Sequence, residues 1–454
     1  MISEKFTPSL ALIILGLSAA GCSNSSDGGD SNNTNTPNNG STASQTTDTS
    51  LSDDSANNAT NISDSTDTSN LSFPIVDTNQ KLCYNSDSSI SCPASKESYF
   101  GQDAQYSNNS PSYRNNGNGT LTDLVTGLLW QKSPDISNDG TINNADKLSY
   151  SDANSYCDSL TLGGSSDWRL PTIKQAYSLI DFNGEDPSGV EGNDTSGLTP
   201  FIDTTYFDFA YGDTDAGQRI IDAQYASSTR YVTTTMNGDE TMFGVNFADG
   251  RIKGYGMSLN GTDKTFYVRC VRGNSSYGEN LLTANGDGTV SDAATGLMWS
   301  VSDSGYGMNW ESALAWVATK NSESYLGYND WRLPNIKELQ GLVDYTVSPA
   351  TDNGRAAIST LFTVTTITNE AEESDAPYYW SSTTHANANG KGTNGAYISF
   401  GRAMGYMNGS WIDVHGAGAQ RSDPKRGSAS EYPTGHGPQG DAIRIENYVR
   451  LVRG

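Results

Sequence analysis

The chain has 454 residues, of which 17% are charged, and a formal net charge of -25. This length suggests about three domains, but one stretch is too polar to fold, so we expect two. The negative charge argues against nucleic acid and sulfated polysaccharide as main partners, because both require a basic surface. A local basic patch remains open.

Residues 1–21 are expected to form a lipoprotein signal peptide. The apolar run from Leu10 to Leu17 is far shorter than the roughly 20 residues of a membrane span, and small residues follow it. Cys22 directly after Ala-Gly resembles a bacterial lipobox, although Ala19 stands where the motif usually has Leu. The resemblance implies a lipid anchor on Cys22, the only membrane contact expected, at the bacterial outer membrane or cell surface. An ordinary signal peptide is the alternative.

Residues 22–73 consist almost entirely of Ser, Asn, Asp, Thr and Gly. Such a segment cannot bury enough apolar surface to offset its chain entropy. We therefore expect a disordered tether.

A short cysteine-containing segment, 74–110, follows the tether. With Cys22 set aside, four cysteines remain in a chain expected to be exported, which suggests disulfides, and four cysteines allow three pairings. The short, turn-prone spacing between Cys83 and Cys92 favours a bridge that staples this segment.

The rest of the chain is a long internal repeat, with copy one at 111–273 and copy two at 280–454. Four blocks recur in the same order, which predicts a duplicated domain, and each copy is large enough to bury its own core. The matching blocks are 117–130 with 286–299, Asp167–Pro171 with Asp330–Pro334, Tyr225–Thr229 with Tyr379–Thr383, and Tyr267–Gly273 with Tyr448–Gly454.

Each copy is expected to open with a hairpin and two helices. The hairpins are predicted at 120–130 and 289–299, and the first helix of copy one at about 151–160. Thr172 and Asn335 each follow a proline and precede a Gln or Glu by three residues, a capping-box pattern that starts a second helix. The remainder is strand-like and rich in glycine. The fold class is therefore α+β.

The repeat also bears on Cys157 and Cys270. Copy two has Val317 and Leu451 at the corresponding places, so both thiols are replaced together by apolar residues. Paired replacement is expected of two positions that touch in the core. A Cys157–Cys270 bridge would tie a helix of copy one to its last strand.

These motifs resemble the bacterial Lcl C-terminal domain, formerly DUF1566, and frame residues 80–454. That family resembles the C-type lectin-like fold. The resemblance implies two tandem lectin-like domains, each with two helices and a mainly antiparallel sheet with long loops. It also implies a disulfide from the first helix to the last strand, and ligand binding on the loops at 230–265 and 384–445.

The loop of copy two has the richer set of recognition side chains. Tyr406, Trp411, His415 and Arg421 combine aromatic rings with polar groups, which suits glycan stacking or protein contact. The alternative is that Tyr406 and Trp411 pack the loop onto its own domain.

Catalytic and cofactor motifs are mostly missing. The three histidines lack metal-binding spacing, and there is no phosphate-binding glycine loop. We expect no cofactor and no enzyme activity. Calcium at the turn containing Asp287 stays open, although a hairpin turn explains those residues without an ion. The repeated Trp-Arg pairs are expected to be scaffold.

Three functions follow in order of preference. The first is a surface-tethered binding or adhesion lipoprotein that recognises a glycan or an extracellular protein through loops of lectin-like domains. The second is a structural envelope subunit that binds another protein. The third is an enzyme of the formylglycine-generating type, which would need a reactive cysteine pair near the C-terminus, where copy two has none.

Overall fold

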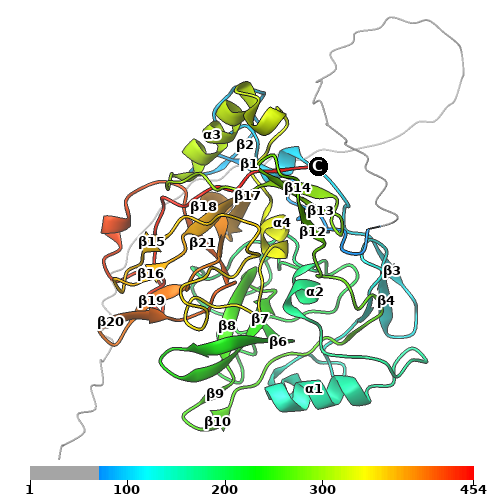
Figure 1. Cartoon of the computed structure of the whole chain (residues 1–454). Helices are drawn as coiled ribbons and strands as arrows, with labels where there is room; N and C mark the ends of the chain where they lie inside the picture. Colours follow the sequence, from blue (N-terminus) through cyan, green and yellow to red (C-terminus); the bar gives the residue numbers. More distant parts are fainter. Residues whose placement is uncertain (1–70) are drawn as a thin grey trace, which may run out of the picture. The chain divides into compact units, whose positions relative to one another are not determined.

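The computed structural model describes residues 71–454 (Figure 1). The expected signal peptide, Cys22 and the tether up to residue 70 lie outside the described residues. Phe73 is buried, with its ring 4.7 Å from that of Tyr277. The folded part therefore starts before residue 74, the boundary expected from composition. Within 71–454, no helix has the length and apolar character needed to cross a bilayer.

Each copy begins with three strands, of which the second and third form the predicted hairpin, and its own last strand completes a four-stranded sheet. The order is β11-β5-β4-β3 in copy one and β12-β13-β14-β22 in copy two. The strands are β3 Tyr113–Asn115, β4 Thr120–Asp123, β5 Leu129–Gln131, β11 Val271–Arg272, β12 Leu282–Ala284, β13 Thr289–Asp292, β14 Leu297–Ser300 and β22 Val452–Arg453. Both predicted hairpins are confirmed.

Two helices follow in each copy. They are α1 Tyr150–Ser159 and α2 Ile173–Tyr177 in copy one, and α3 Trp310–Ser322 and α4 Ile336–Gly341 in copy two. Thr172 and Asn335 cap α2 and α4, and both predicted capping boxes are formed. Because the caps hold such short helices, their start is fixed directly after Pro171 and Pro334.

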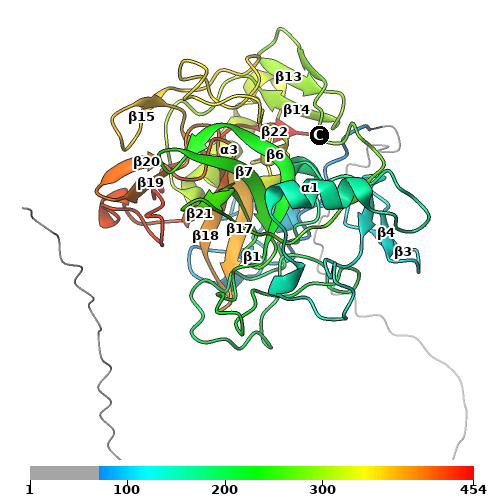
Figure 2. The ribbon, with the colours of Figure 1, turned by 90° about the horizontal axis from the view of Figure 1, so that it is seen from below.

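The largest sheet has six strands and runs through both copies in the order β17-β18-β21-β8-β7-β6. Figures 1 and 2 show the green strands of copy one beside the orange and brown strands of copy two. The strands are β6 Gln224–Thr235, β7 Asp239–Asn246, β8 Arg251–Gly256, β17 Tyr378–Asn387, β18 Lys391–Ser399 and β21 Gln420–Pro424. Antiparallel pairing of β8 with β21 joins the copies.

The seam between β8 and β21 lies on a pseudo-twofold axis. Ile252 pairs with Val245, and Gln420 pairs with Ile398, the equivalent of Val245 in copy two. Ile252 and Gln420 are therefore equivalent positions, and they pair with each other. Their successors, Lys253 and Arg421, are equivalent too and face the opposite side of the sheet.

Each copy buries a smaller apolar cluster of its own, but the largest cluster is common to both copies. One apolar cluster contains Trp130, Phe243 and Tyr267 of copy one together with Trp299 and Ile398 of copy two. Smaller clusters belong to one copy each. A sheet that continues across the seam places apolar side chains of both copies on the same face, so the main core is common to the two.

Both predicted disulfides of the folded part are present. Cys83–Cys92 has a Cα–Cα distance of 5.0 Å, and Cys157–Cys270 has one of 5.5 Å and links α1 to the residue before β11. Val317 and Leu451, which replace the second pair in copy two, lie in one buried cluster.

Short elements complete the described chain. The two-stranded pairs are β1 Cys83–Tyr84 with β2 Ser89–Ile90, β9 Ser258–Leu259 with β10 Thr262–Asp263, β15 Ile367–Thr368 with β16 Ser374–Asp375, and β19 Met404–Met407 with β20 Ser410–Asp413. The 3-10 turns are Asp103–Gln105, Asn144–Asp146, Tyr325–Gly327 and Ala429–Glu431. Of the regions expected as binding loops, 230–265 is thus largely strand, while 384–445 contains β18 to β21 with longer loops between and after them.

Candidate functional site

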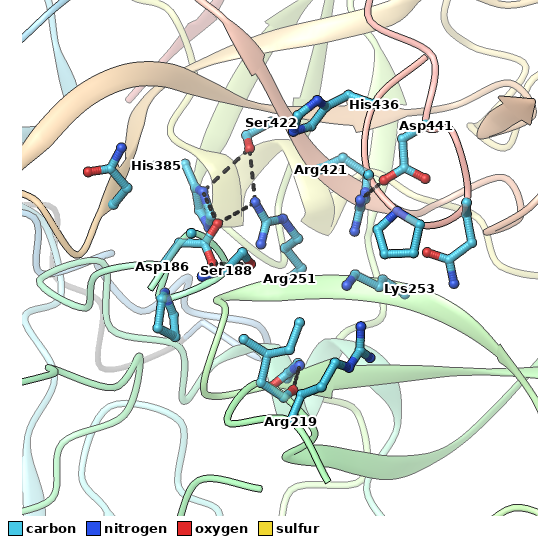
Figure 3. A pocket seen from close by; sticks show the side chains of 18 of the residues that line it. Asp186, Ser188, Arg219, Arg251, Lys253, His385, Arg421, Ser422, His436 and Asp441 are labelled. Carbon is cyan, nitrogen blue, oxygen red and sulfur yellow. Dashed lines mark hydrogen bonds and ion pairs between the residues drawn. The ribbon is translucent and has the colours of Figure 1, made fainter. Parts of the chain in front are cut away.

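A cavity of about 810 Å³ lies on the polar face of the seam, lined by residues of both copies (Figure 3). β8 contributes Arg251 and Lys253, and β21 contributes Arg421 and Ser422. All three histidines of the chain line it: His385 from β17, and His415 and His436 from the segments flanking β21. A volume of this size is typical of small-molecule sites.

One side of the cavity is an ion network around Arg251. Its Nη2 lies 2.7 Å from Oδ2 of Asp186 and its Nη1 lies 3.4 Å from Oδ2 of Asp249, which also accepts a 2.9 Å hydrogen bond from Nζ of Lys253. Burial opposes the ionisation of Asp186, but Arg251 and His385 outweigh it and lower its pKa. The network therefore holds its carboxylates ionised.

His385 is oriented by its two ring nitrogens. Its Nε2 lies 2.8 Å from the carbonyl of Asp249, and because a carbonyl only accepts, Nε2 carries the proton. Nδ1 then accepts from the hydroxyl of Ser422 over 3.4 Å. Burial, followed by the charge of Arg251, lowers the pKa of His385 to about 4. A histidine with this pKa is poorly matched to general-base catalysis at neutral pH.

The other side of the cavity is built on Arg421 and Asp441. Nη2 of Arg421 is ion-paired with Asp441, whose second oxygen lies 2.9 Å from Nε2 of His415. Burial and then the charge of Arg421 lower the pKa of His415 well below its usual value, so the ring is neutral. Burial lowers the pKa of Lys253 to about 8, and Asp249 only partly offsets it.

Several polar atoms of this lining lack a protein partner within 71–454. They are Nε of Arg251, the hydroxyl of Tyr255, Nδ1 of His415, and Nε and Nη1 of Arg421. Guanidinium nitrogens only donate, so the cavity contains an excess of donors. Burying such groups without an acceptor costs free energy.

The four residues expected to bind ligand fall into two places. His415 and Arg421 line the cavity, but Tyr406 and Trp411 do not. The latter pair across the β19–β20 hairpin, with their rings 5.4 Å apart at 67°. Both side chains are half-buried, and their role in ligand binding stays a prediction.

Sequence reasoning missed Asp186, Arg251, Lys253, His385 and Asp441. The sequence contained one signal for Arg251 and Lys253. Arg251 and Lys253 alternate with the apolar Ile252, a pattern that puts two cations on one face of a strand.

Two arginines that recur in the last block of each copy bind backbone carbonyls and lie outside the cavity lining. Arg269 donates to the carbonyls of Gln131 and Asp208, and its counterpart Arg450 donates to those of Ser300 and Thr363. Trp168 and Trp331 are buried. Arg269 and Arg450 thereby tie the segment before the last strand of each copy to the end of its opening hairpin.

Asp287 acts in its turn much as Asn118 does in copy one. Its carboxylate accepts from the amide and hydroxyl of Thr289, while Asn118 accepts from the hydroxyl of Thr120. Among residues 71–454, no group of three or more His, Cys, Asp or Glu side chains is placed to hold a metal ion.

Comparison with known proteins gives one match. The model of the Lcl C-terminal domain matches residues 119–272 and again 288–414. No curated protein and no solved structure matches the chain. The second match ends before β21, the strand that pairs with copy one. Because the two matched segments together span more than half of its length, the chain belongs to the Lcl C-terminal domain family.

Proposed function

We propose that the protein is a surface-tethered binding lipoprotein, used in adhesion, which holds a glycan or an extracellular protein group in the seam cavity. The observation that carries this proposal is the cavity itself, with unpartnered donors supplied by both copies. The lipid anchor on Cys22 and a location at the outer membrane or cell surface are parts of the proposal.

A non-catalytic role is favoured by the site chemistry. His385 has a pKa of about 4, and its contact with the Ser422 hydroxyl, which it could activate as a base, is long at 3.4 Å. All four cysteines of the described chain are in disulfides, so a formylglycine-generating reaction would find no free thiol pair there.

We also propose that each copy follows a C-type lectin-like arrangement. The support is the bridge from α1 to the residue before β11, together with the early helices and the antiparallel sheet. The loops around β21, rather than the β19–β20 hairpin alone, would then carry recognition.

The test is a binding screen of the full-length protein in detergent against glycan and matrix-protein arrays. The variant Tyr432→Ala/His436→Ala removes two side chains from the cavity lining, and Trp411→Ala serves as a matched hairpin control. We expect binding to be lost in the first and kept in the second. A folded protein that binds nothing, and instead copurifies with a stoichiometric membrane partner, would replace this function with that of an envelope subunit.

A further inference from the structure

We infer that the seam cavity takes a ligand with a single carboxylate group, of the class of acidic sugars such as uronic acids. This inference rests on the proposed function, because it names the chemistry of the ligand in the same cavity.

The pseudo-twofold axis explains why cations converge there. Lys253 and Arg421 occupy equivalent positions, one residue after the Ile252–Gln420 pair. Side chains alternate along a strand, so both leave the apolar core and enter the polar face. The duplication thus places one cation of each copy on the same side of the seam, and both line the cavity.

The cationic side chains of the lining carry more donors than the protein's own acceptors satisfy. Arg421 uses only Nη2 on Asp441 and leaves Nε and Nη1 without a protein partner, and Nε of Arg251 is in the same state. A carboxylate is acceptor-only, and charge-assisted hydrogen bonds to it are the strong ones. A neutral sugar hydroxyl has no charge to match the cations of the lining.

The charge of the lining limits how negative the ligand can be. Four of its cations have an ion-paired carboxylate each, and Lys264 has no ion pair among the described residues. The pairs are Arg219–Asp222, Arg251–Asp186, Lys253–Asp249 and Arg421–Asp441. The excess is one positive charge, which suits a monoanion better than a sulfated or phosphorylated polymer.

The rest of the lining suits a sugar ring. Asn193, Asn389 and Gln439 offer amide donors and acceptors for hydroxyls, and Tyr432 offers an aromatic ring. The volume of about 810 Å³ exceeds that of one carboxylate, so there is room for the ring that carries it.

The experiment measures binding of three probes to the full-length protein by calorimetry and NMR: D-glucuronate, its uncharged methyl ester, and glucose. Acetate and inorganic sulfate are separate arms. We expect glucuronate to bind at least about tenfold more tightly than the ester or glucose, as the loss of a charge-assisted hydrogen bond implies. Acetate should bind weakly and sulfate more weakly than glucuronate.

Variants separate this inference from the proposed function. Lys253→Met should remove the preference for glucuronate and Lys253→Arg should keep it, while Lys81→Gln, the same loss of charge at an exposed site outside the lining, should change nothing. Lys264→Gln, a rim change with little risk to folding, should weaken glucuronate alone. Equal binding of glucose and glucuronate, or tighter binding of sulfate, overturns the inference and leaves the binding function standing. No binding of any probe or array ligand by the folded protein overturns both.

Discussion

Lys174 and Lys337 make reciprocal hydrogen bonds, each to a backbone carbonyl of the other copy. Nζ of Lys174, on α2, donates to the carbonyl of Gly341 over 2.8 Å, and Nζ of Lys337, on α4, donates to the carbonyl of Ser178 over 2.9 Å. Each acceptor lies four residues after the other lysine, so the contact obeys the same pseudo-twofold axis as the seam. Burial lowers the pKa of both amines to about 8.

This reciprocal contact predicts that the two copies unfold together. A common core and a continuous sheet leave no boundary at which one copy can open alone. Differential scanning calorimetry should show one transition for the folded part. Lys337→Met should lower the stability of that transition by about 1–3 kcal/mol, because the carbonyls of Asp77 and Ser178 lose their donor. Two separate transitions would contradict the common core.

The Cys157–Cys270 bridge is expected to matter more than the Cys83–Cys92 bridge. It closes a sequence separation of 113 residues against 9, and loop-closure entropy grows with loop length. Removing it should cost about 2–5 kcal/mol in urea unfolding. Cys157→Val/Cys270→Leu, which copies the residues of copy two, should be less damaging than a double alanine variant, because it refills the buried space. Equal loss of stability in both variants would show that Val and Leu do not refill the buried space left by the two cysteines.

Asp103 should make stability fall as the pH rises. Burial, and next the charge of Asp77, raises its pKa from 3.8 to about 7. Between about pH 4 and pH 7 the native state holds a proton that the unfolded chain has released, so the free energy of unfolding decreases with pH. Asp103→Asn has no proton to lose at this position. The stability difference between wild type and variant should therefore change by about 1.4 kcal/mol per pH unit across that window and level off above it. A constant difference would contradict the raised pKa.

Lys253 should make carboxylate binding weaken above pH 8. Its pKa of about 8 in the free protein means that the amine loses its charge there, and a bound anion would raise that pKa. The groups that face it are Asp249, Arg251, Arg421 and His415. The carboxylate and the guanidinium groups stay charged from pH 7 to pH 9, and His415 stays neutral. Glucuronate affinity measured over this range should fall in wild type and stay level in Lys253→Arg. A parallel fall in both would place the titration elsewhere.

The β19–β20 hairpin is expected to be dispensable for the carboxylate. Tyr406 and Trp411 contact each other and lie outside the cavity lining. Trp411→Ala should keep glucuronate affinity within about twofold, as measured by calorimetry. A loss of tenfold or more would return the hairpin to the site.

Most of the features that could be predicted from the sequence are determined by residues close to one another in the chain or by the internal repeat. The capping boxes at Thr172 and Asn335, the opening hairpins and the paired replacement of Cys157 and Cys270 all depend on neighbours in the chain or on the repeat. The seam does not. Ile252 and Gln420 are far apart in sequence, and nothing in either strand indicates that its free edge pairs with the other copy. His415 and Arg421 were therefore expected in a loop, and Lys253 was missed.

The pairing of β8 with β21 has a consequence for any attempt to divide the chain. A fragment that contained only one copy would keep its three long strands but present an uncovered row of backbone donors and acceptors where the other copy should be. Such rows attract further strands, including those of identical fragments. A fragment with one copy alone would therefore tend to self-associate. A chain cleaved between residues 273 and 280 should keep its two parts associated in native buffer.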